Sequence, residues 1–248
     1  MEGIDPGACP ITVERAAMVQ WWDELTFLHW RYPAEQVQAL LPDGLEVETG
    51  DGSAWVSLVP FHLSVALPHT PQVPWLCRFP ETNVRTYVRS PADGRSGVWF
   101  FSLDADRLAA VLVARLGYRL PYVWSRMRLD RAGDRVRYDS RRRWPGPRGA
   151  SCHAVVEPGE AYEPASLTEL DHFLTARWGL FSTPRSGLHH AEVWHEPWPL
   201  HRVEVLELQD ELVAASGLPA PTGPPLAHWS PGVQVRIAWP QAVPTSSR

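Results

Sequence analysis

Lysine is absent from this chain of 248 residues, so all 23 of its Lys and Arg positions are arginine. An enzyme that forms an imine with a carbonyl substrate needs an amine that is unprotonated near neutral pH. A guanidinium stays protonated and delocalised, and it does not form carbonyl imines under those conditions. The missing lysine therefore excludes Schiff-base catalysis by any side chain of this protein.

Cysteine is scarce, and long apolar runs are missing. Cys9, Cys77 and Cys152 are far apart and show no C-x-x-C or zinc-ligand spacing, so neither a disulfide framework nor a structural metal is indicated. No segment has about 18 uninterrupted apolar residues, and the N-terminal MEGIDPGACP lacks a basic start and an apolar centre. We expect a cytoplasmic protein with no membrane span.

An excess of positive charge is also lacking, because the formal net charge is −5 and the sequence pI is about 6.1. Such a chain has no overall basic field to attract nucleic acid or an anionic membrane, so neither partner is expected. The cluster RRRW at 141–144 is interpreted as a solvated turn. No nucleophile elbow, phosphate loop, dinucleotide fingerprint or H-E-x-x-H motif occurs, and we expect no cofactor.

Strands dominate what is present. Apolar and polar residues alternate in segments that are rich in β-branched and aromatic residues and are bounded by Gly or Pro. These segments are 24–30, 54–65, 81–89, 97–103, 150–157, 189–195, 201–208 and 233–239. Two further alternating runs within 126–142 meet at Ala132-Gly133-Asp134, which predicts a hairpin because glycine accepts the positive φ of a tight turn.

Three helices are predicted from their end signals. Pro33 suits the first turn of a helix over 34–41 that Pro42-Asp43-Gly44 stops. Asp104 is a candidate cap for 104–116, which is apolar on nearly every side and is therefore expected to be buried. Ser166 and Glu169 form a capping-box pattern ahead of 170–178. Residues 214–232 are interpreted as an ordered surface connection and 240–248 as a frayed tail.

Because strands far outnumber helices and one helix is predicted to be buried, the expected fold class is α+β. The predicted architecture is a large antiparallel β-barrel or sheet around a central buried helix, with few peripheral helices and room for a cavity. We expect a single domain over 1–248, with a core at about 21–240 and flexible termini.

Seven segments give the chain a resemblance to a known family. They are FLHWRYP, LLPDGLEV, AWVSLVPF, PETNVRTYVR, GVWFFSLDA, GYRLPY and HEPWPL, spread over about residues 21–240. Their order resembles that of the YqjF-like bacterial proteins, a family placed in the acetoacetate decarboxylase-like superfamily. The resemblance implies a cone-shaped, largely antiparallel barrel with a ligand cavity and a central helix, in a family whose activity is mostly undefined.

The resemblance also shows what this chain lacks. In acetoacetate decarboxylases a Gly-Tyr-Pro-Lys-Lys stretch supplies the imine-forming lysine. In GYRLPY, alignment on Gly-Tyr places Arg119 and Leu120 near the two lysines, and alignment on Pro places Tyr122 and Val123 there. The early Arg-Glu pair of the decarboxylases compares with Trp22-Asp23-Glu24, so tryptophan stands where arginine is expected. Glu81 is the one pocket acid that the resemblance carries over.

Candidate ligand-binding residues lie on the strand predicted over 81–89. Period-two alternation places Glu81, Asn83, Arg85, Tyr87 and Arg89 on one face. One interpretation is that Asn83 and Arg85 point inward and hold a carboxylate or carbonyl oxygen, with Tyr87 beside them, because a guanidinium fork suits such groups. The other is a solvent-facing row in which Glu81 and Arg85 offset each other.

Candidate acid–base residues come from three other segments. Tyr122 shares a strand face with Arg126, and a neighbouring arginine that lowered its pKa would make it an acid or an oxyanion donor; the alternative is a packing residue. His195 and Trp198 match the family's His-x-Pro-Trp pattern, and His29 in FLHW is a second matched histidine; either can instead be hydrogen-bonded in the wall. His189 and His195 would lie roughly 20 Å apart along one strand, too far to share a metal.

These observations predict a protein that binds a small, partly apolar carbonyl or carboxylate metabolite. As an enzyme it would be a cofactor-independent lyase, isomerase or cyclase, with Tyr122, His195, His29 and Glu81 as acid–base groups. Its substrate-binding residues would be Asn83, Arg85, Tyr87, Arg126 and Trp198. The alternative is a non-catalytic binding or sensing module on the same scaffold. A third possibility is an interaction protein that binds a protein partner through a surface of exposed tryptophans. A homo-oligomer is left open.

Incubation with acetoacetate and borohydride should leave the mass of the protein unchanged, because the chain offers no side-chain amine for a reducible imine. Mass spectrometry of the intact protein and of its peptides makes the measurement, with the α-amine as the single expected place of any modification. A reduced adduct on a peptide from the interior of the chain would contradict this prediction.

Overall fold

The fold is that of a computed structural model, which describes residues 7–66, 77–115 and 119–244. The helices are α1 (Ala34–Gln38), α3 (Leu108–Val113), α4 (Glu169–Thr175) and α5 (Leu212–Ala215), with a 3-10 turn at Pro164–Ser166. The longer strands are β1 (Ala16–Tyr32), β4 (Ser53–Ala66), β5 (Arg78–Arg89), β6 (Ser96–Ala105), β7 (Tyr122–Ala132), β8 (Arg135–Trp144), β9 (Ser151–Ala161), β12 (His201–Asp210) and β13 (Leu226–Ala238). The shorter strands are β2 (Glu46–Val47), β3 (Thr49–Gly50), β10 (Gly179–Ser182), β11 (His189–His195) and β14 (Gln241–Ala242).

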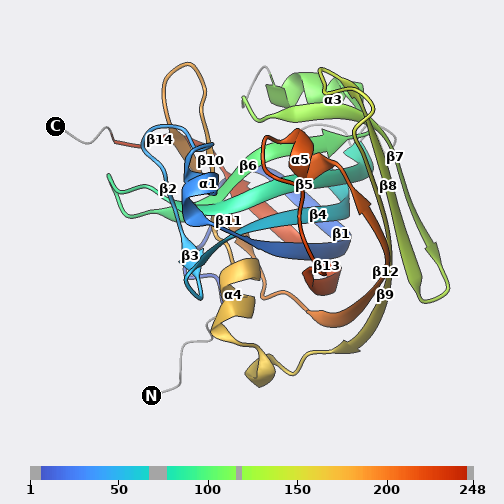
Figure 1. The fold of residues 1–248 in the computed structure, drawn as a ribbon. Coiled ribbons are helices and arrows are strands. Elements are labelled where there is room, and N and C mark those ends of the chain that lie inside the picture. Colours follow the sequence, from blue (N-terminus) through green and yellow to red (C-terminus); the bar gives the residue numbers. More distant parts are fainter. Residues whose placement is uncertain (1–6, 67–76, 116–118, 245–248) are drawn as a thin grey trace.

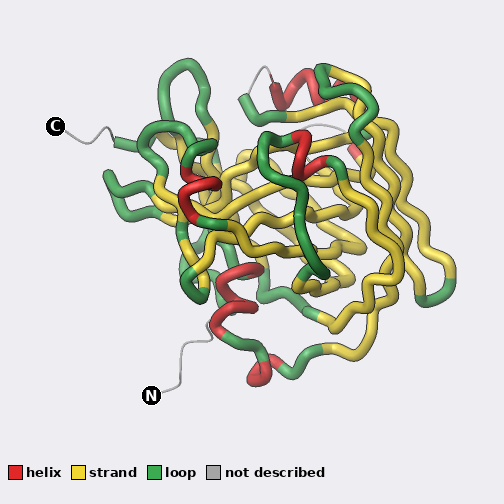
Figure 2. The backbone as a smooth tube through the Cα atoms, viewed as in Figure 1, coloured by secondary structure: helices red, strands yellow, loops and turns green. Residues whose placement is uncertain are grey.

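One large sheet contains all of these strands, and it accounts for most of the backbone in Figure 2. Its order is β14-β11-β10-β6-β7-β8-β9-β12-β13-β1-β4-β5-β2, with β3 beside β4. Most pairings are antiparallel, but β6 runs parallel to both β7 and β10. The sheet is therefore mixed rather than purely antiparallel.

Two additional pairings, β5 with β6 and β11 with β13, close part of the sheet on itself. They complete a ring of β1, β4, β5, β6, β10, β11 and β13, while β7, β8, β9 and β12 form the curved outer layer at the right of Figure 1. A strand in such a ring has one face toward the interior and one toward the outside. Alternate residues of each ring strand therefore meet in one enclosed space.

Strand β4 shows why both faces of a ring strand are apolar. Val59, Phe61 and Leu63 pack inside the ring in one cluster with Phe27 and Trp198. Residues on the other face of β4 pack on a second cluster that includes side chains of α1 and α5. The buried members of that cluster are Leu28, Trp30, Tyr32, Val37, Ala54, Val56, Leu58, Val84, Cys152, Leu212, Val213 and Leu218.

Each predicted strand matches an observed strand, although Ala150 and Trp239 lie just outside β9 and β13. The 126–142 hairpin forms β7 and β8 around Gly133, which has a φ of 62°. The helix predicted after Pro33 is α1, although it is only five residues long. In the described ranges of the chain, no helix is long and apolar enough to cross a membrane.

The prediction of a central buried helix over 104–116 is wrong. Asp104 and Ala105 still belong to β6, because Ala105 pairs with both Glu81 and Trp124. Helix α3 starts only at Leu108 and lies at one end of the ring, where Figure 1 shows it above the strands. Leu108 and Leu112 are each 40% exposed. Helix α3 therefore lies between two open spaces and is not packed on all sides as a central helix would be.

Three smaller predictions also need correction. The capping box before α4 joins Thr168 to Asp171 rather than Ser166 to Glu169, because Pro164–Ser166 forms a 3-10 turn of its own. The predicted surface connection over 214–232 ends earlier, since β13 begins at Leu226 and pairs with β1. Within the predicted frayed tail, Gln241–Ala242 pairs with β11; residues 1–6 and 245–248 lie outside the described residues.

A buried ion pair links the ring to the outer layer. Arg142 of β8 donates to the carboxylate of Asp104 of β6 at 2.8–3.1 Å, and to Ser102 Oγ at 2.6 Å. Ser125 Oγ of β7 donates to Asp104 Oδ2 at 2.7 Å. Both ionic side chains are at most 2% exposed, so each charge is compensated only by its protein partners.

Asp104→Ala should lower the free energy of unfolding by about 3–5 kcal/mol, because it leaves the Arg142 guanidinium buried without its carboxylate. The matched control is Glu157→Ala, which removes an exposed partner of Arg135 and should cost at most about 1 kcal/mol. Urea unfolding followed by tryptophan fluorescence measures both. If both variants lost the same unfolding free energy, the buried Asp104–Arg142 pair would contribute no more to stability than the exposed Arg135–Glu157 pair.

Candidate functional site

The ring encloses a cavity of about 300 Å³. Its walls come from all seven ring strands, from Tyr122 of β7 and from the inner side of α3. Most lining residues are apolar, among them Trp22, Leu25, Phe61, Leu63, Phe79, Phe100, Leu103 and Trp198. A few polar side chains converge on this apolar space, which is the usual composition of a small-molecule site.

Glu81 and Tyr122 form a hydrogen-bonded pair in the cavity wall. The Tyr122 hydroxyl donates to Glu81 Oε2 at 2.9 Å, and Glu81 is 3% exposed. Burial raises the pKa of Glu81 to about 8, although the Tyr122 hydrogen bond partly opposes the shift. Burial, together with the charge of Glu81, raises the pKa of Tyr122 well above its ordinary value. Glu81 is therefore a neutral acid at pH 7, and Tyr122 is not the low-pKa acid that an adjacent arginine would make.

Arg85 brings a positive charge to the same wall. Its guanidinium lies 5.3 Å from the centroid of the Phe27 ring, and Nη2 donates to Leu174 O at 3.4 Å. The side chain is buried, and in the described part of the chain it forms no ion pair, while Nε has no hydrogen-bond partner. Arg85 is therefore a buried positive charge with no ionic partner among the described residues, a situation that is unfavourable by several kcal/mol.

Two more buried polar atoms among the described residues lack partners at this cavity. They are Asn83 Oδ1 and Arg177 Nη2, and both residues line the space. Arg177 differs from Arg85 because its Nη1 is paired with Glu48 at 2.6 Å. Both atoms can therefore form a hydrogen bond with a molecule that enters the cavity.

His195 lines the cavity beside three indoles. Its ring lies 4.5 Å from that of Trp178, 4.9 Å from Trp198 and 6.4 Å from Trp22, measured between centroids. Nδ1 is 2.6 Å from Glu196 O and therefore donates to it, which leaves Nε2 as the unprotonated nitrogen. Burial lowers the pKa of His195 to about 4, so the imidazole is neutral at pH 7.

His29 and Tyr87 lie behind the cavity wall rather than in it. His29 Nδ1 is 2.6 Å from Ser57 Oγ, Ser57 Oγ is 2.7 Å from the Tyr87 hydroxyl, and that hydroxyl donates to Leu174 O at 2.8 Å. Neither His29 nor Tyr87 is among the cavity-lining residues. This buried chain fits the wall-histidine alternative for His29, and the Tyr87 ring supports Arg85 and Arg177 from below.

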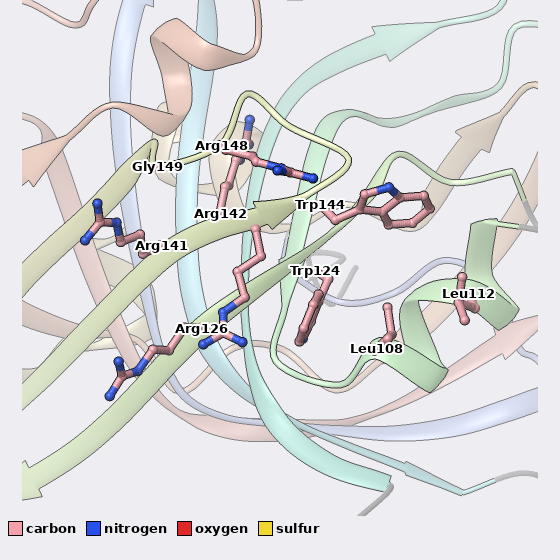
Figure 3. Close-up of a pocket in the computed structure, with 10 residues that line it drawn as sticks. Leu108, Leu112, Trp124, Arg126, Arg141, Arg142, Trp144, Arg148 and Gly149 are labelled. Atoms are coloured by element: carbon pink, nitrogen blue, oxygen red, sulfur yellow. The ribbon is translucent and has the colours of Figure 1, made fainter.

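The structure brings six of the nine predicted site residues to the cavity: Glu81, Asn83, Arg85, Tyr122, His195 and Trp198. Arg126 is placed elsewhere, because β7 leaves the ring after Tyr122, and Arg126 lies in an outer groove (Figure 3). Of the polar row of β5, Glu81, Asn83 and Arg85 point into the cavity, whereas Arg89 is exposed and paired with Glu46, so the row is not a solvent-facing one over most of its length. Among the described residues, no group of three His, Cys, Asp or Glu side chains is placed to hold a metal ion.

Arg177 and Thr175 are cavity residues that the sequence did not indicate. Thr175 ends α4 and Arg177 follows it, and Trp198 Nε1 ties this segment to the ring by donating to Thr175 O at 3.0 Å. Ala109, Ala110 and Ala114 of the α3 region form another part of the wall. No periodic pattern identifies them, since their positions depend on how the segments after α4 and β6 fold onto the ring.

Two comparisons of sequence concern most of the chain. Residues 19–234 match the family DUF2071, described as "Uncharacterized conserved protein (COG2071)". The chain is also 36% identical, over 224 residues, to Uncharacterized protein YqjF of Bacillus subtilis (strain 168), in an alignment that covers 90% of each protein. The resemblance drawn from the seven segments is thereby confirmed.

Solved structures give the fold. An acetoacetate decarboxylase-like enzyme from Sphingomonas wittichii RW1 superposes with a TM-score of 0.62 at 14% identity, covering 91% of this chain and 92% of the other. The enduracididine biosynthesis enzyme MppR, complexed with the condensation product of pyruvate and imidazole 4-carboxaldehyde, gives 0.63 at 15% identity, covering 94% and 92%. These likenesses show an acetoacetate decarboxylase-like fold, as predicted.

The Glu81→Gln variant should differ from the wild type in how its stability depends on pH. Between about pH 4.5 and 8 the folded protein keeps a proton on Glu81 that the unfolded chain releases. The free energy of unfolding of the wild type should therefore fall by about 1.4 kcal/mol per pH unit across this range relative to the variant. Urea titrations from about pH 5 to pH 8 measure the difference, and parallel curves would contradict a buried, protonated Glu81.

Proposed function

The chain belongs to the DUF2071 family and has an acetoacetate decarboxylase-like fold, and from these premises we propose that its cavity binds a small, partly apolar 2-oxo acid and catalyses proton transfer on it. The reaction would be of the lyase, isomerase or cyclase type and would use neither an imine nor a cofactor. The unpaired guanidinium of Arg85, buried at the cavity wall, is the observation that carries the proposal.

A carboxylate is the ligand group that best matches Arg85. The planar guanidinium presents parallel N–H donors at the spacing of two carboxylate oxygens, and Nε is free to take one of them. Glu81 lies four residues before Arg85 on the same strand face. It does not neutralise the Arg85 guanidinium at pH 7, because burial keeps the Glu81 carboxyl protonated. The ligand's carboxylate would supply the missing negative charge.

The rest of the ligand would meet an apolar and aromatic wall. Trp22 and Trp198 stack with centroids 6.0 Å apart, and Phe61 lies 5.8 Å from Trp22. The cavity volume of about 300 Å³ is at the lower end of the range for ligand pockets. A cavity of this size holds a compact metabolite rather than a large cofactor. Asn83 Oδ1 remains available to accept a hydrogen bond from a ligand hydroxyl or amine.

Acid–base chemistry follows from the two neutral groups at the wall. Glu81, with a pKa of about 8, holds a proton that it can donate to a carbonyl oxygen as an enol forms. His195 keeps an unprotonated Nε2 that can accept the proton from the adjacent carbon. Proton-transfer catalysis favours a pKa close to the working pH, and Glu81 meets this condition while His195, with a pKa of about 4, is a weak base. The acid Glu81 is thus the group that supports an enzyme over the non-catalytic binding module.

The choice of a 2-oxo acid rests partly on the related folds. MppR has been solved with pyruvate bound and with a condensation product of pyruvate. Those proteins are only 14–15% identical to this chain, so the ligand is carried over as a proposal about chemical class. A convergent set of polar groups in a cavity also supports ligand binding over the third possibility, a surface of tryptophans for a protein partner.

Arg85→Ala should weaken binding of 2-oxo-4-methylpentanoate by about 1.5–3 kcal/mol, the value for a hydrogen bond to a charged group. The corresponding neutral amide should bind the variant and the wild type almost equally. Titration calorimetry measures both ligands. Equal losses would assign Arg85 a structural role and would end the proposal.

The same ligand separates the enzyme from the binding module. In deuterium oxide, the wild type should exchange the C3 hydrogens of the oxo acid, and proton NMR would follow the loss of their signal. Glu81→Gln should slow this exchange by roughly 10²- to 10⁴-fold while the ligand still binds, because Gln cannot donate the acid proton. Tight binding to the wild type without any exchange would instead identify a non-catalytic binding module.

A further inference from the structure

A second open site lies outside the ring, on the other side of α3. It is a groove of about 930 Å³ between α3 and the β7–β8 hairpin, lined by Leu108, Leu112, Trp124, Arg126, Arg141, Arg142, Arg143, Trp144, Arg148 and Gly149. None of these residues lines the cavity. Helix α3 separates the two spaces, with Ala109 and Ala110 toward the cavity and Leu108 and Leu112 toward the groove.

Four arginines of the groove have no ionic partner among the described residues. They are Arg126, Arg141, Arg143 and Arg148, and all four are exposed. The far end of the same hairpin is different, since Arg128, Arg131, Arg135 and Arg137 are paired with Asp130, Glu24, Glu157 and Asp139. The groove end thus concentrates positive charge in a protein whose formal net charge is −5.

Arg126 and Arg141 face each other directly across the two strands. Like charges at opposed positions of an antiparallel pair destabilise it. No described carboxylate lies within ion-pair distance of either guanidinium, although Asp139 and Glu211 line the adjoining pocket on the other side of the two arginines. None of the ten residues that line the groove is acidic. An anion bound between the two guanidinium groups would relieve this repulsion and would accept charge-assisted hydrogen bonds from both.

Two of the arginines lie at one end of the groove and the leucines lie at the other, while Arg148 lies nearer the tryptophans. Figure 3 shows Arg126 and Arg141 side by side at one end, Trp124 and Trp144 in the middle, and Leu108 and Leu112 on α3 at the other end. Three of the exposed large apolar side chains of the protein, Leu108, Leu112 and Trp144, gather here. The ligand should therefore carry negative charge at one end and a flat or apolar group at the other.

The tryptophans and the loop after β8 are held in place for such a ligand. Arg143 lies 4.9 Å from the centroid of the Trp124 ring, and Arg115 lies 5.5 Å from that of Trp144. Two hydrogen bonds, from Arg142 N to Ala150 O at 2.9 Å and from Gly149 N to Arg142 O at 3.0 Å, close the loop that carries Arg148. Guanidinium groups that stack on indoles present their N–H edges to phosphate oxygens.

From this geometry we propose that the groove binds a nucleoside polyphosphate. Its phosphates would lie between Arg126, Arg141 and Arg148, and its base would lie against Trp144 and the leucines of α3. A groove of this volume is within the range of small-molecule sites. The negative net charge and the local extent of the arginine cluster favour a small ligand over a long nucleic acid, which needs a continuous basic surface.

Titration calorimetry with ATP tests the proposal. ATP should bind the wild type with a Kd in the micromolar range, and the double variant Arg126→Ala/Arg141→Ala should bind it at least tenfold more weakly. The matched control Arg135→Ala/Arg137→Ala removes the same charge from the same hairpin, but from guanidinium groups already paired, and should change the Kd less than twofold. Arg148→Ala, on the loop, should weaken binding severalfold and gives a second variant if the strand variant does not fold.

Other probes decide what is recognised. Tripolyphosphate should bind at least tenfold more weakly than ATP, because it lacks the base, and Trp144→Ala should reduce ATP binding toward that level. The proposal would be overturned if ATP did not bind at millimolar concentration, or if both double variants lost affinity equally. Tighter, groove-dependent binding of tripolyphosphate, of an oligo-dT strand or of phosphatidylserine vesicles would overturn it too, in favour of a polyphosphate, single-stranded nucleic acid or an anionic lipid surface.

Discussion

The pairing of β5 with β6, together with that of β11 with β13, is the constraint on which the rest of the molecule depends. An open sheet would expose one face of β5 to solvent, and its row of polar side chains would be an ordinary hydrated surface. Closure turns the two-residue period of each strand into an inside and an outside. Glu81, Asn83 and Arg85 then share an enclosed space with the aromatic side chains of β1 and β4, and burial there changes the pKa of Glu81.

Burial in the cavity wall shifts the pKa values of Glu81 and His195 in opposite directions. It raises the pKa of Glu81 and lowers that of His195, and both shifts favour the neutral form at pH 7. Arg85 keeps its charge because a guanidinium remains protonated even when buried. The cavity wall therefore combines a neutral carboxyl and a neutral imidazole with one positive charge that has no ionic partner in the described part of the chain. A lysine at the same wall would respond differently, since burial can deprotonate an amine and make it a nucleophile.

The segment from β6 to β8 contributes residues both to the cavity and to the outer groove. Asp104 and Arg142 lie in the partition between the cavity and the outer groove, and their ion pair ties the end of β6 to the hairpin. Helix α3 completes this partition with small side chains toward the cavity and leucines toward the groove. Arginine suits every basic position here, because one side chain can fill a buried ion pair, stack on an indole or face a phosphate without changing its charge.

The sequence alone determined the strands, the hairpin at Gly133, the family and the absence of imine chemistry, because these depend on short-range periodicity, on turn residues and on which functional groups exist at all. It also predicted six residues that the structure places at the cavity: Asn83 and Arg85 from alternation along a strand, and Glu81, Tyr122, His195 and Trp198 with the help of the family resemblance. The tertiary structure alone decided that this face points inward, that Arg126 lies in a separate groove and that His29 is behind the wall. It also decided that α3 is a short partition, since the burial of an apolar segment depends on which distant strands pack against it. Pairing between residues far apart in the chain sets those outcomes, and a local pattern carries no information about which distant partners close the sheet.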